Sequence, residues 1–466
     1  FGGGGFLLDG KPFQIMAGEI HFQRIPREYW ADRLIKLRAA GLNTVCTYVF
    51  WNALEPEQGR WDLSGNNDLA AFVRTAQRAG LWVIVRPGPY ACAEWDFGGL
   101  PAWILRTPDI KVRCADSRYM AACETYIQKI AAEIRDLQIG HGGPILMLQI
   151  ENEYGSYGND RSYTTSLRDM WQKAGMDVPF YTADGASTAM LEAGTVPEAA
   201  IGLDPGTSDK DYAVAEKLGL DVPIFCSELY PGWLTHWGEK WAHVKTEDVV
   251  TELRWLLDNG KSFNLYMFHG GTNFGFWAGA NFADVYQPDV TSYDYDAPLD
   301  EMGRPTPKYN AIRDLLKHYQ PKGTILPDMP PPIATVEIPE ISLRATASLF
   351  ENLPEPVHAP QPGPMEAFGQ AHGFILYRTN FIGRRSGKLV ISELHDYANI
   401  YVDGKFLGTL NRAKSENTIE IPKSEMPRQT LEILVEGMGR INYGPLLMDR
   451  KGITDRVTLN GMTLMN

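Results

Sequence analysis

Short apolar runs alternate with amphipathic helical patterns through the first 320 residues, and this alternation restricts the possible folds most strongly. Eight of the apolar runs are typical of buried β-strands and lie at 14–20, 43–48, 82–86, 145–148, 179–183, 200–203, 224–228 and 262–268. Helical patterns lie between and after them, at 27–40, 69–79, 120–137, 166–174, 212–218, 247–257 and 309–318. Residues 1–320 are therefore predicted to form an α/β domain, a (β/α)8 TIM barrel with enlarged loops.

The first residues of this domain contain a separate signal. Phe6 and Phe13 flank a short segment whose centre is the pair Asp9-Gly10, a combination typical of a tight β-hairpin turn. The hairpin precedes the first barrel strand directly. We therefore expect it to close the bottom of the barrel.

The remaining third of the chain differs in composition. Eleven of the 31 prolines lie between Pro321 and Pro364, which indicates a linker over residues 321–365. Residues 334–343 alternate apolar and polar side chains, so we predict an extended strand there that packs along a sheet. Residues 366–466 are predicted to form an all-β sandwich domain. Its expected strands are 373–381, 388–392, 398–402, 417–421, 429–435 and 456–459, with a hairpin turn at 402–405.

Charge, hydropathy and cysteine usage exclude several classes of partner. The net charge of −13 argues against a nucleic-acid or anionic-membrane partner. No apolar run approaches the ~18 residues of a transmembrane helix, so we expect no membrane span. The five cysteines show no metal-ligand spacing, and we expect neither a metal nor a cofactor. Cys46, Cys92 and Cys226 are interpreted as buried thiols, whereas a Cys114–Cys123 disulfide is the less favoured alternative to free thiols.

Aromatic residues are concentrated in the barrel region. All 12 tryptophans lie between Trp30 and Trp277, and none follows. Aromatic faces suit the apolar faces of sugar rings, although core packing accounts for most buried tryptophans. The first part of the chain is therefore chemically distinct from the rest.

Two predicted barrel strands end in carboxylates. The fourth strand runs into Gln149-Ile150-Glu151-Asn152-Glu153-Tyr154-Gly155, and the seventh runs into Glu228. Each acid alone could be a buried or salt-bridged structural group. In a (β/α)8 barrel, however, the carboxyl ends of the strands carry the catalytic residues. Because these two strands lie on opposite sides of the barrel mouth, their carboxylates can face each other across a substrate.

A pair of facing carboxylates suits the cleavage of a glycosidic bond. Retention of configuration requires the two carboxyl groups about 5–5.5 Å apart, one as acid/base and one as nucleophile. On an ideal strand Glu151 and Glu153 alternate onto the same side, so periodicity does not choose between them. An Asn directly before an acid can bind a sugar hydroxyl beside the reacting centre, and the pair Asn152-Glu153 therefore favours Glu153 over Glu151. We interpret Glu153 as the acid/base, Glu228 as the nucleophile and Glu151 as a buried support.

Several long motifs extend this interpretation to a family. They occur in order at 85–95, 98–103, 149–155, 232–238, 264–268, 270–274, 291–299 and 439–444. Together they resemble glycoside hydrolase family 35, the β-galactosidases. The resemblance implies a retaining exo-β-galactosidase that forms a galactosyl-enzyme, with a galactose-containing oligo- or polysaccharide as its substrate. It also implies a further β-domain with a Gly-Arg-Tyr-Trp-like stretch, and the printed sequence contains no such stretch.

The resemblance implies a set of galactose-binding residues as well. These are Tyr48, Cys92, Ala93, Glu94, Asn152, Tyr266 and Tyr295. Physically, Glu94 can accept two hydroxyl hydrogen bonds, and a tyrosine can orient a carboxylate. Trp233 is a candidate sugar platform, with core packing as the alternative.

Two other functions remain compatible with the sequence, namely another retaining exo-β-glycosidase and a catalytically silent carbohydrate-binding barrel. The presence of both Glu153 and Glu228 speaks against the silent barrel. We expect the enzyme in the periplasm or outside the cell, because substrates derived from polymers favour that location. The sequence indicates neither the oligomeric state nor the group to which the galactose is attached.

Overall fold

The computed structural model describes residues 1–2, 4–383 and 385–465. The chain divides into two compact units. The first contains Phe1–Met329 together with the short segments Gly369–His372 and Met438–Arg450, and the second contains the rest of the chain. In the described part of the chain, no helix has the length and apolar character needed to cross a bilayer.

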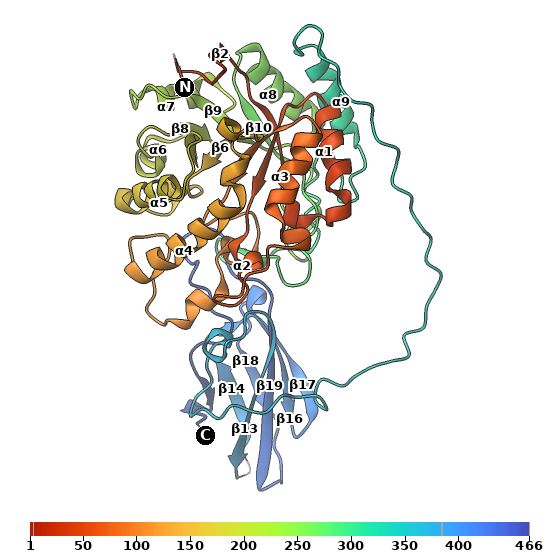
Figure 1. Cartoon of the computed structure of the whole chain (residues 1–466). Coiled ribbons are helices and arrows are strands. Elements are labelled where there is room, and N and C mark those ends of the chain that lie inside the picture. Colours follow the sequence, from red (N-terminus) through yellow and green to blue (C-terminus); the bar gives the residue numbers. More distant parts are fainter. Residues whose placement is uncertain (3, 384, 466) are drawn as a thin grey trace. The chain divides into compact units, whose positions relative to one another are not determined.

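The first unit is the predicted barrel (Figure 1). Eight parallel strands close on themselves in the order β10-β3-β4-β5-β6-β7-β8-β9. Their bounds are β3 Met16–Ile20, β4 Thr44–Tyr48, β5 Trp82–Arg86, β6 Ile145–Gln149, β7 Phe180–Asp184, β8 Ala200–Leu203, β9 Ile224–Leu229 and β10 Phe263–His269. All eight expected strands are present.

Nine α-helices accompany the described strands of this unit. They are α1 Trp30–Ala39, α2 Trp51–Leu54, α3 Leu69–Arg78, α4 Ser117–Ile134, α5 Arg161–Lys173, α6 Thr188–Gly194, α7 Asp209–Glu216, α8 Thr246–Asp258 and α9 Pro307–Lys317. The sequence pattern did not indicate α2 and α6, and it placed the start of α5 five residues late. The Asp160 side chain caps α5 by accepting from the Ser162 and Tyr163 amides, so the polar first turn is helical.

The N-terminal hairpin closes the barrel as expected. Strands β1 (Leu7–Leu8) and β2 (Lys11–Pro12) pair antiparallel around the Asp9-Gly10 turn. Phe6 and Phe13 pack against the apolar cluster inside the barrel. The Phe6 ring lies 5.5 Å from that of Phe225, near the beginning of β9.

The second unit contains two four-stranded antiparallel sheets, β13-β19-β16-β17 and β18-β14-β21-β22. The bounds are β13 Gly373–Ile382, β14 Gly387–Ile391, β16 Tyr397–Val402, β17 Lys405–Asn411, β18 Thr418–Ile421, β19 Arg428–Gly437, β21 Val457–Leu459 and β22 Met462–Thr463. Alternate residues of these strands form one apolar core, which confirms the predicted β-sandwich. The expected turn at 402–405 joins β16 to β17, a strand that the sequence pattern did not indicate.

Two segments from the sandwich region of the sequence cluster with the barrel instead. In Met438–Arg450, the Arg440 guanidinium forms a buried ion pair with Asp96 at 2.9 Å. Ile441 pairs with Ala280 through the backbone, next to β11 (Ala280–Phe282). The sequence boundary at 366 does not separate these segments, because their contacts are long-range and leave no local pattern.

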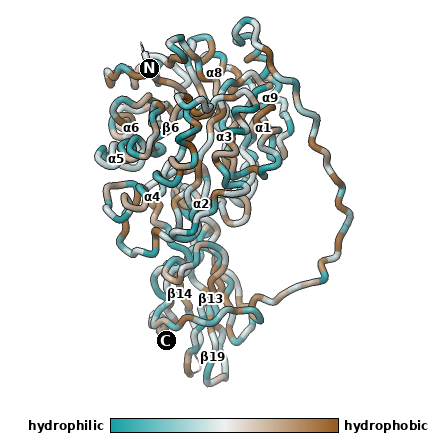
Figure 2. Tube along the Cα trace, in the orientation of Figure 1, coloured by the Kyte–Doolittle hydropathy of each residue, from teal (hydrophilic) through white to brown (hydrophobic). Residues whose placement is uncertain are grey.

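The prediction of an extended strand at 334–343 is wrong. The described residues of this segment form no strand, and Val336, Ile338 and Leu343 are 82%, 72% and 86% exposed. Figure 2 shows the corresponding hydrophobic stretches along the thin connecting tube. Alternation alone does not make a strand, because the backbone also requires a partner edge for its hydrogen bonds.

The cysteines agree with the favoured interpretation. All five thiols are free, and Cys46, Cys92 and Cys226 are buried. Cys114 and Cys123 form no disulfide. Cys123 is buried as well, so four of the five serve as small apolar residues of the barrel unit.

Candidate active site

The predicted acids follow the carboxyl end of β6, where the strand geometry stops. The strand ends at Gln149, and Glu151 and Glu153 have φ angles of 60° and 43°. Left-handed backbone at non-glycine residues costs on the order of 1–3 kcal/mol and persists only where contacts hold it. Here the Glu153 amide donates to the Ala183 carbonyl at 2.9 Å. The assumption that Glu151 and Glu153 alternate on an ideal strand is therefore wrong, and their side chains have separate partners.

Glu151 is clamped by an arginine. Arg113 donates to its two carboxylate oxygens at 2.8 and 2.9 Å, and the Tyr163 hydroxyl donates at 2.9 Å. Arg113 also donates to the Asn152 carbonyl at 2.7 Å. Both charged side chains are buried. These contacts fit the interpretation of Glu151 as a support for the loop that carries Asn152 and Glu153.

Glu153 has a different environment. It is half-buried, and the Asn152 side-chain amide lies 3.5 Å from one of its oxygens. Burial and the nearby Glu228 charge raise the pKa of Glu153 to about 7, whereas Arg113 and Arg86 act in the opposite direction. A carboxyl with this pKa can be protonated at neutral pH and can also lose its proton during a reaction cycle.

Glu228, on β9, accepts two close hydrogen bonds. Arg86 donates at 2.5 Å and the Tyr230 hydroxyl at 2.9 Å. The Tyr48 hydroxyl lies 3.3 Å from the carboxylate and donates its one hydrogen to the closer Asn152 side-chain oxygen at 2.7 Å. Burial raises the pKa of Glu228, and the Arg86 charge opposes that rise. These two donors orient the carboxylate, a suitable arrangement for a group that must attack from one direction.

Arg86 connects the predicted acids to residues that the sequence pattern did not single out. It ends β5 and is fully buried. Its guanidinium donates to Asn152 at 2.9 Å, to Glu19 at 2.8 Å and to Gln149. The sequence feature that could have indicated a role for Arg86 is a single arginine at the end of an apolar strand. Tyr230, two residues after Glu228, had no comparable signal.

The predicted sugar-binding loop follows β5. Cys92, Ala93 and Glu94 have successive φ angles of 66°, 62° and 50°. Glu94 accepts from the Tyr293 hydroxyl at 2.6 Å, and Arg24 donates to the Ala93 carbonyl. Burial raises the pKa of Glu94. Hydrogen bonds from Arg24 and Tyr293 therefore stabilise the loop, whose left-handed backbone conformation requires such contacts.

The predicted aromatic residues gather around these acids. The Tyr266 ring lies 6.3 Å from Tyr48 and 5.7 Å from Tyr295. The Trp233 ring lies 6.3 Å from Tyr295 and 5.3 Å from Tyr230, and it is 48% exposed. The exposure of Trp233 favours the platform interpretation over core packing. The Tyr266 hydroxyl lies 3.1 Å from the Tyr293 hydroxyl.

The segment Met438–Arg450 also reaches this loop. The Cys92 sulfur lies 3.4 Å from the Asn442 side-chain oxygen, and the Tyr90 hydroxyl donates to the Asn442 carbonyl. Burial and the charge of Glu153 contribute to a pKa of about 12 for Tyr443. Residues 350 and 352 positions apart in the chain thus belong to one site. Local sequence patterns cannot reveal such contacts.

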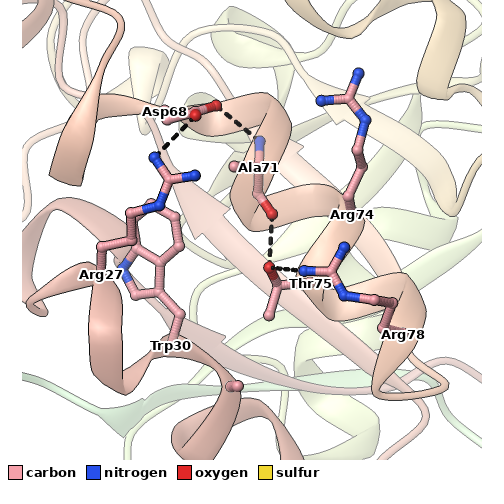
Figure 3. Close-up of a pocket in the computed structure, with 8 residues that line it drawn as sticks. Arg27, Trp30, Asp68, Ala71, Arg74, Thr75 and Arg78 are labelled. Atoms are coloured by element: carbon pink, nitrogen blue, oxygen red, sulfur yellow. Dashed lines mark hydrogen bonds and ion pairs between the residues drawn. The ribbon is translucent and has the colours of Figure 1, made fainter.

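A surface hollow between α1 and α3 contains none of the predicted site residues (Figure 3). Arg27 pairs there with Asp68 at 3.0 Å, and Arg78 donates to Thr75 at 2.8 Å. Among the residues that the structure describes, no group of three or more His, Cys, Asp or Glu side chains could hold a metal ion.

Comparison with known proteins identifies the family. The model of Glycosyl hydrolases family 35 matches residues 5–319, and that of Beta-galactosidase, first all-beta domain, matches residues 362–466. The chain is 47% identical over 469 residues to a "Beta-galactosidase" of Xanthomonas manihotis, covering 98% of this chain and 77% of the relative. It is 39% identical over 472 residues to a "Beta-galactosidase" of Homo sapiens, covering 98% and 69%. The chain therefore belongs to glycosyl hydrolases family 35.

Proposed function

We propose that this protein is a retaining exo-β-galactosidase that removes terminal β-galactose from oligo- or polysaccharides. The observation that carries the proposal is the pairing of Glu153 and Glu228 at two barrel strand ends. The pKa of Glu153 is about 7, partly because the Glu228 charge is near. Glu228 is oriented by hydrogen bonds from Arg86 and Tyr230. Galactose is proposed as the sugar because the relatives are named β-galactosidases.

In the first step, a Glu228 oxygen attacks the anomeric carbon and the bond to the leaving oxygen breaks. Glu153 gives its proton to that oxygen, so the leaving group departs as a neutral alcohol. Glu228 is then a neutral ester, and its charge no longer raises the pKa of Glu153. Glu153 can now act as a base.

In the second step, Glu153 takes a proton from water as the water oxygen attacks the anomeric carbon. The ester bond to Glu228 breaks, and the galactose leaves with its original configuration. The site returns to its starting protonation. We assign the contacts with galactose to Tyr48, Cys92, Ala93, Glu94, Asn152, Tyr266 and Tyr295, with Trp233 as an exposed platform at the mouth.

A comparison of aryl β-galactoside with aryl β-glucoside tests the proposal. We expect the galactoside to be hydrolysed faster, with β-galactose as the first product by proton NMR. α-Galactose as the first product would contradict retention. Preference for the glucoside would indicate another exo-β-glycosidase, and inactivity on both would indicate a silent binding barrel.

We further propose that the enzyme works in the periplasm or outside the cell, where galactose-containing polymers are degraded. Activity toward aryl β-galactoside in fractions of the source cells checks this. Activity confined to the cytosolic fraction would contradict it.

A further inference from the structure

A second buried carboxylate shares Arg86 with Glu228. Glu19 lies on β3 and is fully buried. One terminal nitrogen of Arg86 lies 2.8 Å from Glu19 Oε2, and the other lies 2.5 Å from Glu228 Oε1. The guanidinium thus bridges two carboxylates from two different barrel strands. The reaction proposed above uses only one of them.

The partners of Glu19 are hydrogen-bond donors, which suit a carboxylate. The Asn264 amide donates to Oε2 at 2.6 Å, and His21 Nε2 lies 3.0 Å from Oε1. His21 Nδ1 lies 2.6 Å from a terminal nitrogen of Arg24, which can only donate. Nδ1 therefore accepts, and Nε2 carries the hydrogen that points to Glu19. Burial raises the pKa of Glu19, whereas the Arg86 charge and the hydrogen bonds from Asn264 and Arg86 oppose that rise.

We propose that Glu19 is a positioning residue that keeps Arg86 paired in both halves of the reaction cycle. The proposal rests on the double displacement proposed above. In the free enzyme, Arg86 divides its hydrogen bonds between Glu19 and Glu228, so Glu228 is not fully neutralised and remains nucleophilic. In the galactosyl-enzyme, Glu228 is an uncharged ester, and Glu19 is still the counterion of Arg86.

The energetic reason is the cost of an unpaired buried charge. Removing one member of a buried ion pair is strongly destabilising because the other charge is left without compensation. Formation of the galactosyl-enzyme removes the Glu228 charge chemically, at a site where Arg86 and Glu228 are both buried. With Glu19 in place, this step leaves the ion pair Arg86–Glu19 intact.

Other titratable and charged groups face this cluster from the surrounding strands. They are Cys46 and Tyr48 on β4, Cys92 and Glu94 after β5, Glu153 after β6, Tyr181 on β7, Asp204 after β8, Cys226 on β9, Tyr230 after β9, Tyr266 on β10, Tyr295 after β10, and His21 and Arg24 after β3. In the described part of the chain, Arg86 forms ion pairs with Glu19 and Glu228. A change at Glu19 should therefore alter the hydrogen bonding and the pKa of Glu228 more than those of the other groups.

Glu19→Gln tests the proposal on the two steps separately. Arg86 should then bind Glu228 alone, so the acid limb of the kcat/KM profile should move to lower pH. Formation of the glycosyl-enzyme, measured as the rate of inactivation by a 2-deoxy-2-fluoro glycoside, should slow about tenfold, the order expected for a unit charge one guanidinium away at an effective dielectric of about 20. Reactivation of the trapped enzyme should accelerate, because its Arg86 lacks a counterion.

Glu55→Gln is the matched control. Glu55 is also a buried carboxylate, held by the Trp51 indole at 2.7 Å and the Gly59 amide at 2.6 Å, without an arginine. It should leave the acid limb and the ratio of the two rates unchanged. An unshifted limb in Glu19→Gln, or equal slowing of both steps, would overturn the proposal and leave Glu19 as a structural group.

Asn264→Ala provides a second variant if Glu19→Gln does not fold. Loss of a donor makes Glu19 more basic and draws Arg86 toward it, so the acid limb should move to higher pH. A limb that stays in place overturns the proposal. All profiles are measured on the aryl β-glycoside that the wild type hydrolyses best. A sugar other than galactose would therefore contradict the proposed function without affecting the test of Glu19.

Discussion

Glu151 and Glu153 are two residues apart, yet their carboxylates have opposite surroundings. Glu151 is paired at both oxygens with Arg113 and hydrogen-bonded to Tyr163. Glu153 is half-buried beside another carboxylate, and its pKa is about 7. A cation in direct contact holds an acid in its charged form, whereas burial near a like charge keeps it protonated. The same side chain thus serves as a fixed anchor at one position and as a proton carrier at the other.

The largest effect is expected at Glu228. Its charge raises the pKa of Glu153, whereas Glu151 is paired with Arg113. Glu228→Gln should abolish turnover of aryl galactosides, because the attacking oxygen is lost. In Glu228→Gly, azide should restore activity and give the α-configured galactosyl azide. Product configuration is measured by NMR. Substantial turnover by purified Glu228→Gln would contradict its role as nucleophile.

The next effect is expected at Glu153 and should depend on the leaving group. A disaccharide needs the proton, so Glu153→Ala should slow its hydrolysis about 10²–10⁴-fold. Dinitrophenyl galactoside needs no proton to leave, so the galactosyl-enzyme should form quickly and hydrolyse slowly. Stopped-flow absorbance should then show a burst of dinitrophenol. Equal losses on the two substrates would exclude Glu153 as the general acid.

Glu151→Ala should produce a smaller and different loss. Disordered support should slow both substrates alike, on the order of 10–10²-fold. Because Arg113 would be left buried without its partner, the free energy of unfolding should fall by about 3–5 kcal/mol. Chemical denaturation measures this change. Glu124→Ala, at an exposed pair with Lys173, is the control and should cost at most about 1 kcal/mol.

A leaving-group dependence in Glu151→Ala that is missing from Glu153→Ala would reverse the assignment of the two acids. Their contrasting contacts make this outcome a direct test of the comparison.

The smallest effect is a difference between two pH profiles. Glu153 must be protonated for the first step, so kcat/KM for a disaccharide should fall as the pH rises through about 7. The profile for dinitrophenyl galactoside should show a weaker basic limb, because its leaving group needs no proton. The same limb on both substrates would assign that ionisation to another group.

Much of this site follows from local patterns in the sequence. The apolar runs before Glu153 and Glu228 predict parallel strands, and strands of a closed barrel bring their carboxyl ends to one mouth. Trp233 and the loop from Cys92 to Glu94 were placed through the family motifs that contain them. The eight barrel strands were predictable because each is a continuous buried run, whose signal does not depend on its neighbours.

Other features depend on contacts between distant segments. The strand expected at 334–343 is absent because no partner edge pairs with it. Strand β17 pairs with β16, although its own sequence pattern is weak. Met438–Arg450 belongs to the barrel unit through the Arg440–Asp96 ion pair, which joins residues 344 positions apart. Each of these three features depends on residues that are distant in the sequence.

The sequence by itself determined which strands form and which of them end in carboxylates, because burial and periodicity act over a few residues. Only the tertiary structure decided that Glu151 meets Arg113 while Glu153 lies near Glu228, since left-handed backbone at both positions breaks the strand alternation. It also placed Arg86 between Glu228 and Glu19, on three different strands. The charge state of a buried acid depends on what the closed barrel brings within a few ångströms, and that proximity is not written in any single segment.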